Sequence, residues 1–294
     1  MAHHSSSGPS LHEKELRYME TYDQSLSLWP VSYESLYIST RFGAAHVLAS
    51  GPKEAPPLVL LHGYLFSSTM WFPNVAELAG SHRVYAIDII NDKNKTEASK
   101  SCVTRADFAN WLFDILHALG IEQANFAGLS YGAAQIMNFI HYFPNRVEKA
   151  VLMSPAEGLV PFHPDFYHYA YGLTQPNGYE NMLNWMMGDR YVLPPSFDSQ
   201  YRAAVDWQTS SPPAPLHKDG FPYVFTDEEL RKVSVPMLLL LGQEEVMYNP
   251  FEAAERATKL IRSIRVEMVE GAGHVLTMEK SDEVNKRMAS FFQA

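Results

Sequence analysis

The sequence predicts an α/β fold with a mostly parallel central sheet and helices on both faces. Three observations lead to this prediction. Strand-like and helical segments alternate along most of the chain, which is typical of right-handed strand–helix–strand units. Residues 56–63 and 235–242 are continuous apolar runs, as expected for strands buried on both faces of a parallel sheet. With 294 residues, the chain is long enough for one large domain that carries an inserted subdomain.

The first half of the chain supplies the first strands and a helix. Residues 1–10 are polar, with two histidines and a serine–glycine run, and we expect them to be a tag or disordered. A short amphipathic helix follows from residue 11. A helix is predicted at 104–120 because its apolar residues fall on one face, Thr104 and Asp107 are spaced as a capping box, and Gly120 suits a C-terminal cap. The apolar runs in this half predict strands at 45–50, 56–63 and 82–90.

The second half continues the alternation after an interruption. A strand at 124–129 runs directly into a helix at 131–143, which Pro144 ends. Between residues 157 and 226 there is no strong strand; the segment is rich in aromatic residues and methionine, and Pro-Asn-Gly and Pro-Pro breaks keep its helices short. We therefore predict an α/β core domain at 11–156 and 227–294, with a helical cap inserted at 157–226. The remaining expected elements are strands at 148–156, 235–242 and 265–271 and a closing helix at 281–293.

Composition and charge exclude several classes of partner. The 23 basic and 33 acidic residues give a formal net charge of −10, and no lysine or arginine cluster is present, so we expect neither nucleic acid nor a membrane as partner. The one cysteine, Cys102, excludes an intramolecular disulfide and fits a reducing compartment. No uninterrupted apolar run is long enough to cross a bilayer, and the start of the chain has no apolar signal segment. A cytoplasmic location is the expectation; the sequence does not indicate the oligomeric state.

The sequence Gly128-Leu129-Ser130-Tyr131-Gly132 turns a strand into a helix within one residue. Such a turn forces the serine into sparsely populated backbone angles, and the two glycines relieve the crowding between strand and helix. It lifts the hydroxyl above the carboxyl edge of the sheet, next to the helix N-terminus, which favours negative charge. This G-x-S-x-G pattern between an apolar strand and a helix predicts Ser130 as a nucleophile.

A serine nucleophile needs a base and an acid. His274 follows the last apolar strand through Gly271 and Gly273, whereas most of the other histidines lie near the start of the chain, in helices or in the cap. The acid is expected after the strand 235–242, where the chain carries Glu244 and Glu245; we favour Glu245, because its neighbour should face solvent. Glu157, at the end of the strand 148–156, is a rival.

The oxyanion hole is expected at two backbone N–H groups. His62 and Gly63 follow a buried strand directly, and Gly63 permits the bend that turns the N–H of Tyr64 toward the site. The second donor is the N–H of Tyr131 at the start of the helix. We expect the His62 ring to bond loop backbone and to take no part in the chemistry.

In combination, these motifs resemble the α/β-hydrolase superfamily from about residue 45 to the C-terminus. At closer range, "APPLVLLHG", "NWMMGD" and "LLLLGQEEVMYNP" resemble bacterial carboxylesterases of the naproxen-esterase type. That resemblance implies hydrolysis of small carboxylic esters, no cofactor or metal, and a catalytic glutamate, Glu245, in place of the commoner aspartate. The leading hypothesis is a serine carboxylesterase that favours apolar or aryl esters.

The chain departs from the superfamily pattern after the strand that ends near Asp88. Many members carry D-x-R-G-x-G-x-S there, whereas this chain has "DIINDKNKTEAS", so this loop must be built differently and is a candidate to shape the pocket. Other Ser–His–acid activities on this fold stay open as alternatives: C–C hydrolases, hydroxynitrile lyases and cofactor-free perhydrolases. A small-molecule receptor that retains the triad is an alternative of a different class.

Overall fold

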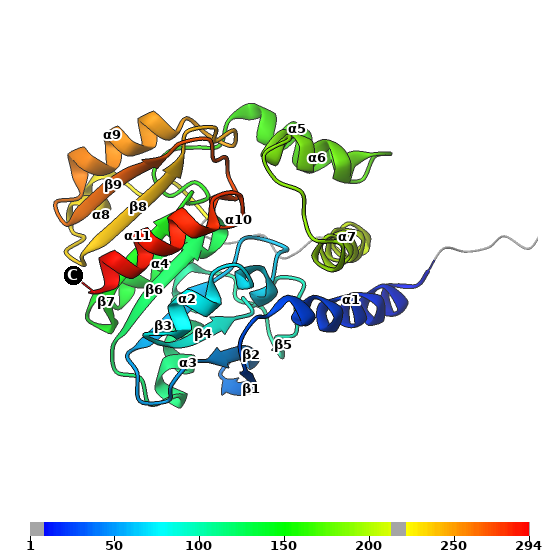
Figure 1. Cartoon of the computed structure of the whole chain (residues 1–294), viewed down its shortest axis with the longest axis horizontal. Coiled ribbons are helices and arrows are strands. Elements are labelled where there is room, and N and C mark those ends of the chain that lie inside the picture. Colours follow the sequence, from blue (N-terminus) through cyan, green and yellow to red (C-terminus); the bar gives the residue numbers. More distant parts are fainter. Residues whose placement is uncertain (1–8, 213–221, 294) are drawn as a thin grey trace, which may run out of the picture.

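The computed structural model describes residues 9–212 and 222–293, which form a sheet with helices packed on it (Figure 1). The expected tag at residues 1–10 lies outside the described residues except for its last two positions. The strands run in the spatial order β1-β2-β4-β3-β6-β7-β8-β9, with β5 beside β2. Their bounds are β1 Tyr33–Thr40, β2 Gly43–Ser50, β3 Pro57–Leu61, β4 Arg83–Ile87, β5 Glu97–Ala98, β6 Ala124–Leu129, β7 Val147–Met153, β8 Met237–Gly242 and β9 Ile264–Val269.

The mostly parallel sheet predicted from the sequence is confirmed. The strands from β4 through β3, β6, β7 and β8 to β9 are parallel, whereas β1 pairs antiparallel with β2 and β2 pairs antiparallel with β4. The sequence reading did not include β1. This edge strand alternates exposed and half-buried residues, so it lacks the continuous apolar run that marks β3 and β8.

Helices cover the sheet on both faces. In Figure 1, α2 and α11 lie in front of the sheet and contact each other, and α4 lies behind it. The predicted capping box of α3 is present: Thr104 Oγ1 accepts from the Asp107 N–H at 3.1 Å, and Gly120 follows the helix with a φ of 69°. The amphipathic α9 was not predicted. The helices of the core are α1 Leu11–Ser25, α2 Val75–Ala79, α3 Arg105–Ala118, α4 Tyr131–Tyr142, α8 Asp227–Arg231, α9 Pro250–Leu260, α10 Leu276–Glu279 and α11 Ser281–Gln293, with short 3-10 turns at Leu26–Leu28, Ser68–Trp71 and Pro144–Arg146.

The segment between β7 and β8 contains the helices α5 (Pro164–Gly172), α6 (Gly178–Met187) and α7 (Pro195–Ser210), which lie beyond the carboxyl ends of the parallel strands (Figure 1). The N-terminal helix α1 packs along α7. Lys14 Nζ lies 2.7 Å from an Asp206 carboxylate oxygen, and the rings of Tyr18 and Trp207 are 5.5 Å apart. Helix α1, which the domain division predicted from the sequence assigns to the core, thus also packs against the inserted segment through α7.

Candidate active site

Strand β6 passes into helix α4 at Ser130 without an intervening loop. Ser130 has a φ of 52° and a ψ of −114°, a conformation that L-residues rarely adopt. Both flanking glycines are required by space. A Cβ on Gly132 would lie 2.1 Å from the carbonyl oxygen of Leu61, and a Cβ on Gly128 would lie 2.7 Å from the carbonyl carbon of Gly132. The predicted elbow is therefore a place where two backbones approach too closely for side chains.

The elbow places Ser130 on the wall of a cavity. Three backbone hydrogen bonds hold the strained residue: the Ser130 N–H donates to the Met153 carbonyl at 2.9 Å, and the Ser130 carbonyl accepts from the Ala134 N–H at 3.0 Å and the Ala156 N–H at 3.1 Å. Ser130 is 8% exposed and lines a cavity of about 530 Å³, called here the Ser130 cavity. His274 lines the same cavity, so the structure brings the two residues to one site.

His274 and Glu245 form a buried pair. His274 Nδ1 lies 2.7 Å from Glu245 Oε2, and both residues are less than a tenth exposed. The other carboxylate oxygen, Oε1, accepts the N–H groups of Val246 and Met247, each at 2.9 Å. Burial raises the pKa of Glu245, but the charge and hydrogen bond of His274 and the backbone donors outweigh it, so the pKa lies below its usual value. An ionised carboxylate only accepts hydrogen bonds, and therefore Nδ1 of His274 carries the proton.

The two rival acids are placed differently. Glu244 is exposed, although it precedes Glu245 directly. Glu157 is half-buried at the start of the insertion, with a φ of 52°, and burial raises the pKa of its carboxyl. Neither is among the described residues that line the Ser130 cavity, whereas the His274 ring is bonded to Glu245.

The loop after β3 reaches the cavity with Gly63 and Tyr64, and Tyr131 reaches it from the start of α4. The rings of the two tyrosines pack edge to face, 6.0 Å apart. His62 is fully buried, and both of its ring nitrogens are engaged by backbone: Nδ1 lies 2.8 Å from the Gly63 carbonyl, and Nε2 accepts the Ile89 N–H at 2.9 Å. Burial lowers the pKa of His62, and Nε2 carries no proton because it accepts the Ile89 N–H, so the ring is neutral and joins two loops. The sequence predicts only that this ring bonds loop backbone.

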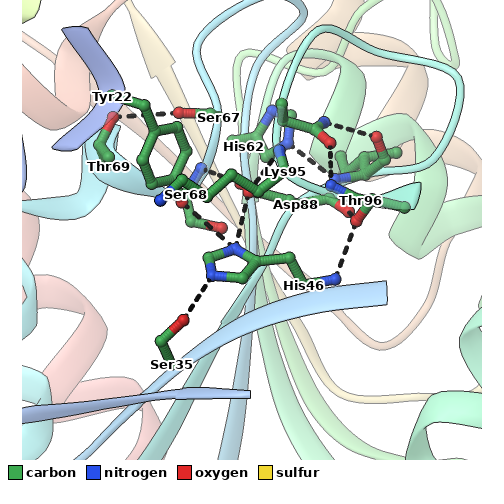
Figure 2. Close-up of polar contacts among 12 residues, drawn as sticks. Tyr22, Ser35, His46, His62, Ser67, Ser68, Thr69, Asp88, Lys95 and Thr96 are labelled. Atoms are coloured by element: carbon green, nitrogen blue, oxygen red, sulfur yellow. Dashed lines mark hydrogen bonds and ion pairs between the residues drawn. The ribbon is translucent and has the colours of Figure 1, made fainter. Parts of the chain in front are cut away.

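A second buried network fixes the two loops that border the cavity. Figure 2 shows Asp88, at the end of β4, accepting the Ser68 N–H at 2.7 Å and lying 2.9 Å from Nδ1 of His46. The same carboxylate accepts the Lys95 N–H at 3.2 Å. His46 comes from β2, and its Nε2 lies 2.8 Å from the hydroxyl of Ser35 on β1. One carboxylate thus ties the loop after β3 and the loop after β4 to the antiparallel side of the sheet.

The sequence reading did not name the side chains that the loop after β4 supplies. Asn91 and Asp92 line the Ser130 cavity, and the side chain of Asp92 is 1% exposed. The sequence nevertheless indicated this loop as a candidate to shape the pocket, because it departs from the superfamily pattern.

Within residues 9–212 and 222–293, no group of three or more His, Cys, Asp or Glu side chains is arranged to hold a metal ion. Among the same residues, no helix is long and apolar enough to cross a membrane.

Comparisons with known proteins agree with the geometry. Residues 58–287 match the model of the alpha/beta hydrolase family. The chain is 54% identical to the carboxylesterase nap of Bacillus subtilis, over 100% of this chain and 98% of that protein. It is 50% identical to the carboxylesterase YbfK of the same organism, over 95% of this chain and 94% of that protein. The crystal structure of naproxen esterase (carboxylesterase NP) from Bacillus subtilis superimposes with a TM-score of 0.93 at 54% identity, covering 97% of this chain and 100% of that one. The resemblance and the fold predicted from the sequence are confirmed.

Proposed function

The chain belongs to the alpha/beta hydrolase family, and from this premise we propose that it is a serine carboxylesterase that cleaves small carboxylic esters through an acyl-enzyme intermediate. The observation that carries the proposal is the joint placement of Ser130 and the Glu245-bonded His274 on one cavity. The relatives named as carboxylesterases support it, since they share half of their residues with this chain over nearly the full length.

We propose the following chemistry. Nε2 of His274 removes the proton of the Ser130 hydroxyl, which attacks the ester carbonyl carbon, and the imidazolium then gives that proton to the leaving alcohol. Water activated by the same ring hydrolyses the acyl-enzyme. No hydrogen bond joins the Ser130 hydroxyl to the His274 ring among the described residues, and we expect this contact to form with substrate bound, as catalytic pairs commonly do.

Glu245 keeps Nδ1 of His274 protonated, so that Nε2 is the basic nitrogen, and stabilises the imidazolium. The backbone N–H groups of Tyr64 and Tyr131 are the proposed oxyanion donors; Tyr131 is the first residue of α4, where the helix dipole favours the negative charge of the intermediate. No cofactor takes part in these steps. We also propose that residues 157–226 form the cap domain. A cytoplasmic location is proposed because the single cysteine cannot form an intramolecular disulfide, which fits a reducing compartment.

The walls of the cavity indicate which esters fit. Most of its lining is apolar or aromatic and comes from the loop after β3, from α5 and α6 with the residues that flank α5, and from the loop after β8, with adaptable methionine side chains among them. We therefore propose that aryl and medium-length acyl esters are preferred over strongly polar ones. The apolar lining consists chiefly of Leu65, Phe66, Phe162, Phe166, Ala170, Leu173, Met182, Met186 and Met247.

A panel of p-nitrophenyl esters of graded acyl length tests the proposal. The parent enzyme should hydrolyse the medium-length and aryl esters and show a burst of one p-nitrophenol per active site when deacylation is slow. Ser130→Ala should fold normally and lose about 10³-fold or more in kcat, because the hydroxyl is the nucleophile rather than a packing group. An alanine variant with near-parental turnover and a burst would show that another residue forms the acyl-enzyme.

A further inference from the structure

One wall of the Ser130 cavity is polar. It combines the loop after β4, through Asn91 and Asp92, with helix α7, through Tyr201, Gln208 and Thr209. These two segments lie side by side, since the ammonium group of Lys93 lies 4.5 Å from the centre of the Trp207 ring on α7. A cavity lined mainly by apolar groups with a few polar ones uses the polar ones to orient and select its ligand.

Asp92 is the one acidic side chain among the described residues that line this cavity. Its Oδ2 accepts the Leu65 N–H at 2.8 Å, and its Oδ1 accepts the Lys93 N–H at 2.7 Å. Each carboxylate oxygen has two lone pairs, so capacity to accept a further hydrogen bond is left on both. The carboxylate thus lies against the loop that carries Tyr64, in the wall of the Ser130 cavity.

The charge of Asp92 has no bonded cation to offset it. Among the described residues, the ion pair nearest to it is with His62, whose Nδ1 lies 3.9 Å away, and that ring is neutral because burial lowers its pKa. The ammonium of its neighbour Lys93 is turned to Trp207. Burial, with a further contribution from Asp88, raises the pKa of Asp92 to about 7, as expected of a carboxyl group without a cationic partner.

We propose that Asp92 is a specificity-determining residue that sorts ester substrates by charge, disfavouring esters with an anionic group and favouring those with a cationic group relative to neutral esters of the same shape. The inference rests on the proposed esterase function and deepens it. Its physical basis is that a charge in a confined, largely apolar cavity is poorly screened. A uniformly apolar cavity would reject anionic and cationic groups alike, because both must be desolvated.

Asp92 also holds the Leu65 N–H, so its replacement affects more than charge. Leu65 has a φ of 64°, and Asn at position 92 has one accepting oxygen where Asp has two. Damage to the loop lowers turnover of every ester by a similar factor, whereas loss of the charge changes the ratios between esters. The ratio of kcat/KM for a charged ester to that for its neutral isostere therefore separates the two effects.

The test uses two ester series, one with the variable group on the acyl arm and one with it on the alcohol arm. Each series ends in tert-butyl, trimethylammonium or carboxylate, so that shape is nearly constant while charge changes. The assays are run at about pH 9, well above the pKa of Asp92, where the carboxylate is ionised. The enzymes are the parent, Asp92→Asn, Asp92→Glu and, as a matched control, Asp114→Asn. Asp114, on α3, pairs with Arg41 in the turn between β1 and β2 and does not line the cavity, so its replacement removes the same charge elsewhere.

In at least one series, we expect the parent to rank trimethylammonium above tert-butyl above carboxylate once each is compared with the uncatalysed rate. Asp92→Asn should lower the cation-to-neutral ratio and raise the anion-to-neutral ratio by about tenfold each, the effect of one unit charge about 6 Å away at intermediate screening. Asp92→Glu should keep the parental ratios even if all rates fall. Asp114→Asn should keep them as well, which separates the cavity charge from the net charge of −10.

Three results would overturn the inference. One is a parent enzyme that hydrolyses the carboxylate esters as fast as the neutral ones in both series, which needs no variant. The second is an Asp92→Asn enzyme with all rates lowered and all ratios unchanged, which would make Asp92 a loop support only. The third is an equal change of the ratios in Asp114→Asn. A parent that hydrolyses none of the neutral esters would instead refute the proposed function, and the inference with it.

Discussion

Replacing Glu245 by Gln tests the proposed triad at its least predictable member. In the parent, Oε1 is occupied by the N–H groups of Val246 and Met247, and Oε2 accepts from Nδ1 of His274. Glutamine has one accepting oxygen and one NH2 group. The two backbone donors hold the oxygen, so the NH2 group must face Nδ1. Nδ1 then has to accept a hydrogen bond from this NH2 group, so the ring proton moves to Nε2. Nε2 is the nitrogen that must act as base toward Ser130.

The expected loss follows from this exchange of tautomers. A ring protonated on Nε2 cannot take the serine proton, and a wrong tautomer of this kind costs about 10⁴-fold in kcat in the best-studied triad, which corresponds to about 5.5 kcal/mol of transition-state stabilisation. KM should change little, because Glu245 is not among the described residues that line the Ser130 cavity. Steady-state kinetics with a p-nitrophenyl ester, together with a thermal melt to show that the variant is folded, measure both quantities.

Two glutamates provide controls for the same substitution. Glu244→Gln changes an exposed neighbour, and Glu157→Gln changes the half-buried rival at the start of the insertion. Each should stay within about tenfold of the parent, because neither contacts the His274 ring. If Glu157→Gln were the crippling change and Glu245→Gln a mild one, the acid would lie after β7 rather than after β8, and the reasoning from the hydrogen-bond pattern would be wrong.

Two further predictions concern stability. Gly132→Ala would place a Cβ 2.1 Å from the Leu61 carbonyl oxygen, so we expect a loss of about 1–3 kcal/mol in unfolding free energy together with loss of activity; Gly172→Ala, where nothing lies within 4 Å, should leave both nearly unchanged. Equal urea midpoints for the two variants would contradict the steric argument. Burial raises the pKa of Asp88, but bonding and charge from His46 outweigh it and set the pKa at about 2, below the usual 3.8. The resulting stability of about 2 kcal/mol is complete above about pH 5 and is lost as pH falls through 2 toward about pH 1. Over this pH range, the free energy of unfolding measured with urea should therefore fall more steeply with decreasing pH for the parent than for Asp88→Asn. Identical slopes would show that this carboxylate does not cause the loss of stability in acid.

The features that the sequence determined by itself are local ones. The elbow at Ser130 needs only the apolar run of β6, two glycines and the helical pattern of α4, all within about twenty residues. The buried parallel strands are legible because both of their faces are apolar, and the cap of α3 because Thr104 and Asp107 are neighbours in the chain. The edge strand β1 was not predicted because only one of its faces packs against the protein, which leaves a weak alternating pattern in the sequence.

Tertiary structure alone decided which distant groups meet. The choice among Glu244, Glu245 and Glu157 depends on β8 lying beside β9 in the sheet and on the direction in which one turn faces, and neither is encoded by spacing along the chain. The same holds for Asp92, whose loop faces the cavity only because the Asp88 network and α7 hold it there. Periodicity and turn chemistry act over a few residues, whereas these contacts join segments dozens of residues apart that come together only when the sheet has formed.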